Sequence, residues 1–186
     1  MQLACYAVLT AMSPERKQNP VTIEEIISNA KEIMLRDGKH VPVVIIEADT
    51  KLLAGQIPDM PPTHGERVEL MRFLGQAAGK SGRIDHLQQV FMVQEGWMSV
   101  ATEDKPPEVR PSQDPNRKEV LIISAIQIKE HKKQMKVFEI LRDSDEKVVG
   151  FEEFMPDEEK KDESIEVPLL DAFVHGFQTA FRTKFN

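Results

Sequence analysis

Two segments of the chain begin with the same helix-starting pattern of polar residues. Thr22 is followed three residues later by Glu25, and Thr63 is followed by Glu66. In this capping-box spacing the threonine hydroxyl accepts a hydrogen bond from the third helical N–H, and the glutamate carboxylate accepts one from the threonine N–H. Apolar residues recur behind each threonine at three- and four-residue steps. The pattern predicts a helix from Thr22 to a left-handed stop at Gly38, and a second helix that starts at Thr63.

The end of the second helix and the start of a third are also marked. Gly79 and Gly82 are expected to end the second helix at about Ala78. Pro168 suits the first turn of a final helix, because the N–H that proline lacks would have no helical partner there. Large apolar side chains then recur at helical spacing, at Leu170, Phe173, Val174, Phe177 and Phe181. The final helix is therefore predicted to pack this side against the core or against a second copy of the chain.

Six apolar runs rich in β-branched residues are predicted to be strands. The runs are Val41–Ala48, Lys51–Ile57, Leu87–Gln94, Val120–Ile128, Met135–Leu141 and Lys147–Phe154. The third and fourth runs are expected at the centre of an antiparallel sheet. Glu95, Gly96 and Trp97 are expected to break the third run and to begin a polar, proline-rich connection.

The order of these elements predicts an α+β fold. Strands mostly follow one another instead of alternating with helices, and short polar turns join the last three into an antiparallel meander. We expect a single domain over residues 1–186, with about three helices flanking a mainly antiparallel sheet of about four to six strands. Residues 1–20 are an N-terminal extension and residues 155–167 an acidic surface loop. Val41–Ala48 and Val120–Ile128 are apolar on both sides, which favours a covered second sheet face, and dimerisation is one way to cover it.

Composition narrows the class of protein. A chain of 186 residues can bury a core without disulfides or metals. The net charge of −7 argues against nucleic acid or an anionic membrane as the main partner, because either would require a basic surface. The single cysteine, Cys5, excludes an internal disulfide and fits a reducing compartment. The apolar N-terminal run lacks a basic flank and is too short to span a bilayer. We therefore expect a cytoplasmic protein that binds neither nucleic acid nor membrane.

The connection between the third and fourth strands carries the residues best suited to recognition. Indole offers a flat surface with one hydrogen-bond donor, and guanidinium groups bind carboxylates or phosphates through two parallel bonds. We take five residues as candidate ligand-binding residues: Trp97, Arg110, Ser112, Asp114 and Arg117. The same residues suit a purely structural loop, in which Asp114 and Arg117 brace a turn and Trp97 packs in the core.

Catalytic motifs are absent from the sequence. There is no G-x-S-x-G elbow, phosphate-binding loop, dinucleotide fingerprint or H-E-x-x-H zinc motif. The five histidines are not spaced to present two metal ligands from one element, so no metal or cofactor is expected and no catalytic residue is assigned. The favoured function is a non-catalytic binding or adaptor protein that acts as a homodimer and takes a protein partner or a small anionic ligand. The alternative is a small hydrolase with its site near Trp97 and the Arg110–Arg117 loop.

Overall fold

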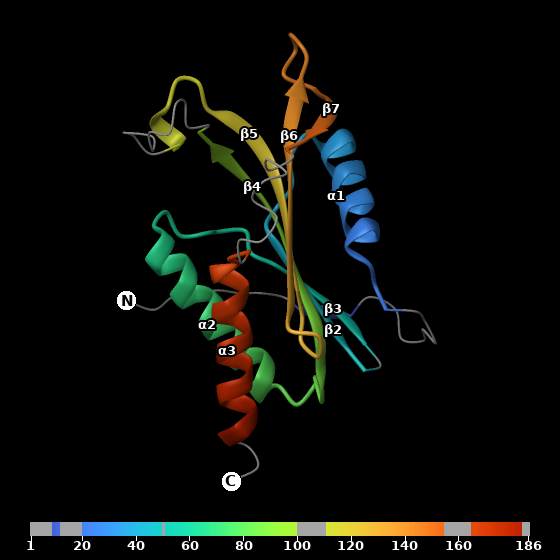
Figure 1. The fold of residues 1–186 in the computed structure, drawn as a ribbon, viewed down its shortest axis with the longest axis vertical. Helices are drawn as coiled ribbons and strands as arrows, with labels where there is room; N and C mark the ends of the chain where they lie inside the picture. The colour runs from blue at the N-terminus through green and yellow to red at the C-terminus, as the bar shows by residue number, and fades with distance from the viewer. Residues whose placement is uncertain (1–8, 12–19, 50, 100–110, 155–164, 184–186) are drawn as a thin grey trace.

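A single antiparallel sheet of seven strands forms the centre of the structure, a computed structural model (Figure 1). The residues that it describes are 9–11, 20–49, 51–99, 111–154 and 165–183. The strand order is β1-β3-β2-β4-β5-β6-β7, and every neighbouring pair is antiparallel. The strands are β1 (Leu9–Ala11), β2 (Val43–Ala48), β3 (Leu52–Gln56), β4 (Leu87–Met98), β5 (Lys118–Gln127), β6 (Lys132–Arg142) and β7 (Val148–Glu153). The helices are α1 (Ile23–Asp37), α2 (His64–Lys80) and α3 (Pro168–Thr183), with one 3-10 turn, η1 (Pro111–Gln113). The predicted α+β fold with a mainly antiparallel sheet is confirmed.

The sheet is a meander in its second half, as the sequence predicts. Strands β4 to β7 are neighbours in chain order, and β4 and β5 lie in the interior of the sheet. The strand missing from the prediction is β1, which comes from the expected N-terminal extension and pairs with β3. Three residues give too short an apolar pattern to distinguish a strand from a connection.

Helices cover both faces of the sheet (Figure 1). On one face α2 and α3 pack over alternate residues of the central strands, including Val44, Ile46, Val90 and Met92. On the other face α1 packs over the intervening residues, including Phe91 and Val93 of β4. Because successive strand residues point to opposite faces, each central strand is buried on both sides. None of the helices in the described segments is long and apolar enough to cross a membrane.

Polar contacts fix the start of α1 against the sheet. The capping box predicted at Thr22 and Glu25 is present, and Gly38 ends the helix in a left-handed conformation at φ 73°. The Val21 N–H donates to the Glu47 carboxylate of β2 at 3.2 Å, and Gln89 of β4 donates to both the Val21 carbonyl oxygen and the Glu47 carboxylate. The first turn of α1 is therefore tied to the two strands below it.

The covered second face bears on the expected dimer. Val43 and Ile45 of β2, which made that strand apolar on both sides, pack against the core layer beneath α1. The second face is thus covered within the chain, and its apolar residues no longer require a second copy. The homodimer stays a prediction.

Strand β4 is longer than the sequence predicts. Glu95, Gly96 and Trp97 do not break it, since they pair with Leu121, Val120 and Glu119 of β5. Glycine reads as a strand breaker because it weakens a strand and packs no side chain. Here the long partner β5 supplies a continuous ladder that carries β4 through the glycine to Met98.

Glycines bring α2 and α3 into direct backbone contact. A Cβ atom on Gly75 would lie 2.0 Å from the carbonyl oxygen of Phe173. A Cβ atom on Gly176 would lie 2.1 Å from the carbonyl oxygen of Arg72. Both distances are far inside van der Waals contact, so no other residue fits at this crossing without moving a helix.

Gly79 belongs to the same contact and does not end α2, contrary to the prediction. The helix continues to Lys80 and is capped by Ser81. A Cβ atom on Gly79 would lie 2.8 Å from the carbonyl oxygen of Phe177. Close helix packing, not helix termination, explains this glycine, whereas Gly82 supplies the left-handed turn at φ 69°.

Adding one methyl group at the helix crossing is expected to destabilise the fold. Gly176→Ala should lower the free energy of unfolding by about 1–3 kcal/mol or more, because the backbone of Arg72 blocks the new Cβ. Gly65→Ala in α2 is the matched control, since nothing lies within 4 Å of its Cβ position. That change should stabilise the protein by about 0.4–1 kcal/mol. Urea denaturation measures both, and equal effects would contradict the close crossing.

Truncating Phe177 tests the packing of α3. Its side chain is buried at 4% exposure in the core between α3, α2 and the sheet. Phe177→Ala should therefore cost about 3–5 kcal/mol of unfolding free energy. Phe73→Ala, at a site 58% exposed on α2, should leave the urea midpoint nearly unchanged. An unchanged urea midpoint for Phe177→Ala would contradict the burial of Phe177 between α3, α2 and the sheet.

Candidate functional site

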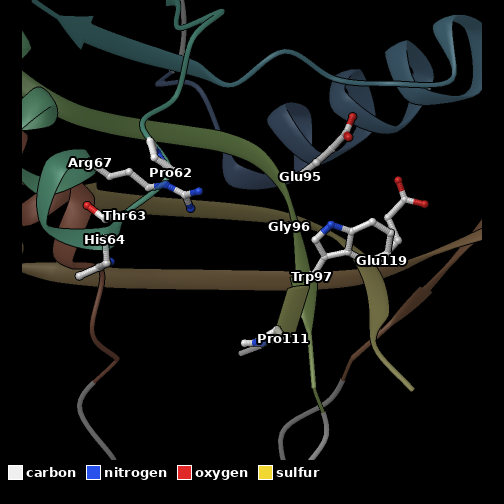
Figure 2. A pocket seen from close by; sticks show the side chains of 9 residues that line it. All are labelled: Pro62, Thr63, His64, Arg67, Glu95, Gly96, Trp97, Pro111 and Glu119. Carbon is white, nitrogen blue, oxygen red and sulfur yellow. The ribbon is translucent and has the colours of Figure 1, made fainter. Parts of the chain in front are cut away.

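A cleft of about 640 Å³ lies between the start of α2 and the ends of β4 and β5 (Figure 2). Residues from the two strands form one wall, and residues from the loop before α2 and its first turn form the other. The lining residues are Pro62, Thr63, His64, Arg67, Glu95, Gly96, Trp97, Pro111 and Glu119. Its volume is in the range of ligand-binding sites.

One edge of β4 faces this cleft without a neighbouring strand. The last pair between β2 and β4 is Val43 with Val93, so β4 extends past β2 from Gln94 to Met98. On its other side the same stretch pairs with β5. Within the described ranges, no strand pairs with β4 beyond Val93 on the β2 side.

The hydrogen-bonding groups at this edge follow from the register. Ile128 donates its N–H to the carbonyl oxygen of Gln88, so the backbone groups of Gln88 point toward β5. Bonding direction alternates along an antiparallel strand, and the β4–β5 register runs without a shift from Gln89 to Met98. Glu95 and Trp97 therefore direct their N–H and C=O groups away from β5, to the side where the cleft lies.

The α2 wall is held in place by its own hydrogen bonds. The Glu66 N–H donates to the Thr63 hydroxyl oxygen at 3.3 Å, and the Glu66 carboxylate accepts the Thr63 N–H. Arg67 donates from Nε to the carbonyl oxygen of Pro61 at 2.6 Å. Figure 2 shows its guanidinium group reaching from α2 toward the strands. Arg67 is thus the positive side chain of this wall.

Trp97 lies on the strand wall and is 47% exposed. The guanidinium carbon of Arg117 lies 4.4 Å from the centre of the indole ring. This distance is within the range of a cation–π contact. Trp97 is therefore a half-exposed aromatic surface stacked on a guanidinium group, and it does not pack in the core.

Two carboxylates share the strand wall, and groups of the same chain engage both. Arg142 binds Glu119 through two nitrogen atoms, at 2.7 Å each, and also donates to the Gly38 carbonyl oxygen. The hydrogen bond with Glu119 raises the pKa of Arg142. The Glu95 carboxylate accepts the backbone N–H of His40. These contacts tie the end of α1 to β4, β5 and β6.

His40 lies behind this wall and is buried at 8% exposure. Its Nδ1 lies 2.8 Å from the carbonyl oxygen of Val41. Burial lowers the pKa of the imidazole below its usual value. The neutral ring is therefore a structural part of the wall at neutral pH.

The predicted recognition residues have different outcomes. Trp97 lines the cleft and Arg117 stacks on it. Asp114 accepts the Asn116 N–H at 2.8 Å and closes a turn, which matches the structural alternative for this residue. Arg110 lies outside the described residues, as does the side chain of Ser112.

Sequence reasoning missed most of the other lining residues. Glu95 and Glu119 lie at the two ends of the loop that the sequence singled out, just outside the predicted strands, and no pattern assigned either of them to a site. Thr63, His64 and Arg67 come from a helix start far away in the chain, and no sequence spacing connects them to Trp97. The capping box marked the position of Thr63 without indicating a site.

The chemistry of the cleft suits binding. Among the described residues, no group of three histidine, cysteine, aspartate or glutamate side chains could hold a metal ion. Both carboxylates already hold hydrogen bonds within the chain. The wall offers an aromatic face, backbone donors and acceptors, and charges of both signs.

Comparison with known proteins identifies a family. No curated protein and no solved structure matches the chain. The model of one family, described as bacteriophage lambda protein ea47, matches residues 6–179. This match covers nearly all of the 186 residues. The chain therefore belongs to the family of bacteriophage lambda protein ea47.

Proposed function

We propose that the chain is a non-catalytic binding protein whose cleft beside β4 holds a segment of a protein partner. One observation carries the proposal: β4 continues past the end of β2 and presents the half-exposed Trp97 along a cleft. Aromatic side chains are enriched at binding sites because they offer a large rigid contact area.

The state of the two carboxylates favours binding over hydrolysis. A general acid or base must reach the proton that it transfers. Glu119 is held by two bonds to Arg142, and Glu95 holds the backbone of His40. Both groups thus have structural tasks. The hydrolase alternative stays a prediction without a residue assigned to it.

A small anionic ligand is the less favoured occupant. Among the described residues that line the cleft, Arg67 is the only arginine or lysine, and the lining also includes Glu95 and Glu119. An anion would find one cationic side chain on the α2 wall, because Arg117 is stacked on Trp97 and Arg142 is paired with Glu119. Homodimerisation and a cytoplasmic location also stay predictions, and sedimentation at several concentrations tests the first.

Peptide arrays test the proposed binding. Capped random peptides of about nine residues, long enough to span the free edge of β4, are probed with wild type, Trp97→Ala and Phe73→Ala. Phe73 is the matched control, since it is exposed on α2 and does not line the cleft. We expect peptides that bind wild type and Phe73→Ala equally and lose about tenfold or more with Trp97→Ala, as for an aromatic residue at the centre of an interface.

Solution measurements provide a second readout. Trp97 is the single tryptophan, so its fluorescence reports on the cleft alone. When a peptide from the array is titrated into the protein, the emission of Trp97 should change and reach a plateau as the cleft becomes saturated. The proposal fails if no peptide binds, or if every bound peptide is indifferent to Trp97→Ala.

A further inference from the structure

We propose that the cleft recognises its partner by strand addition, in which an extended peptide pairs with the free edge of β4 and presents a lysine or arginine to Glu95. This inference rests on the proposed binding function and makes it specific. Backbone hydrogen bonds to β4 would supply the affinity, and the lysine or arginine of the peptide would supply the selectivity.

The edge offers a complete set of backbone partners. The N–H and C=O groups of Glu95 and Trp97 point away from β5, and β2 has ended before it reaches them. In the described part of the chain, no backbone hydrogen bond engages these groups on that side. An extended peptide that lies along this edge, past the segment whose His40 N–H contacts the Glu95 carboxylate, would pair with both residues, as in other sheets that accept an added strand.

Within the described residues, the stretch of β4 from Gln94 to Met98 carries few of the usual protections of a sheet edge. Exposed edges are normally blocked by lysine, proline, a bulge or a covering element. The residues from Gln94 to Met98 include no lysine and no proline, and their register with β5 has no bulge. The cleft lies where a covering element would be. An edge kept open beside a cleft is suited to pairing.

Side chains on the α1 side of the edge favour a cation. Glu95 and Trp97 are two residues apart on β4, so both point to this side. Glu95 accepts the backbone N–H of His40 and, among the described residues, is in direct contact with no cation, whereas Glu119 is paired with Arg142, whose charge also acts on Glu95. A basic side chain of an added strand would lie beside this carboxylate and close to the indole ring.

The other side of the edge favours an uncharged or acidic side chain. Gly96 points to this side and has no side chain of its own, and the nearest atoms to its Cβ position are 3.5 Å away on Ile122. Arg67 and His64 form the wall opposite. The alternating strand would thus present a basic residue to Glu95 and an uncharged or acidic one to Arg67. The net charge of −7 also attracts basic segments over a longer range.

Backbone methylation tests the strand pairing. The tightest array peptide is resynthesised with a single N-methyl group at each position in turn, and its affinity is measured through Trp97 emission. In an added strand, alternate N–H groups bond to β4 and the others point away. We expect losses of about tenfold at alternate positions in the centre of the peptide and less than about twofold between them. Losses without this alternation would overturn the inference.

A charge exchange tests the predicted selectivity. Arrays in which one central position is lysine, norleucine or glutamate are compared on wild type and Glu95→Gln. The glutamine keeps an oxygen acceptor for the His40 N–H, so the fold should persist, and thermal melting checks this. We expect lysine to bind wild type about fivefold or more tightly than norleucine, with glutamate weakest. Glu95→Gln should remove the preference for lysine.

The two proposals fail in different ways. If no peptide changes the emission of Trp97, both the binding function and strand addition are wrong. If peptides bind through Trp97 without the alternation, the binding function stands and strand addition is overturned. If the alternation appears without the lysine preference, the role given to Glu95 is overturned. The norleucine comparison on wild type does not depend on any variant folding.

Discussion

The register between β4 and β5 determines most of this structure. Ten residue pairs, from Gln89 with Gln127 to Met98 with Lys118, run without a shift. This ladder decides which side chains of the central strands face α1 and which face α2 and α3. A slip of β4 by one residue against β5 would exchange the two faces of β4 and place Glu95 and Trp97 on the side of the helix pair, while Glu119 of β5 stayed on the α1 side. The same pairing with β5 extends β4 past the end of β2. The register that sets the core therefore also sets the strand edge beside the cleft.

Patterns along the chain were sufficient to predict the fold. Capping boxes at Thr22 and Thr63 marked two helix starts correctly, and six apolar runs marked six strands. These signals depend on neighbouring residues, so the sequence contains them. What failed depended on distant residues. Gly96 read as a strand end because the support of β5 is not local, and Gly79 read as a helix end because its contact with Phe177 is not local either.

The site was predicted less well, and for the same reason. Trp97 was singled out for its chemistry, and it is half-exposed at the edge of the cleft. Arg67 could not be connected with it, because the path of the chain from α2 to β4 is a property of the whole fold. The unpaired edge of β4 was the feature hardest to predict from the sequence. A backbone group has no sequence signature, and only the sheet order shows that, in the described ranges, no strand pairs with Glu95 and Trp97 on the β2 side.

The glycine crossing of α2 and α3 has a consequence for how recognition can change. Helix α2 supplies both the contact surface for Gly176 at Arg72 and the cleft wall at Arg67, little more than one helical turn apart. Any side chain that pushes α3 outward therefore tilts or shifts the wall that carries Arg67. Substitutions on α3 would retune the width of the cleft without touching a residue that lines it. The shape of the cleft can thus change through a remote helix while the residues that line it keep their sequence.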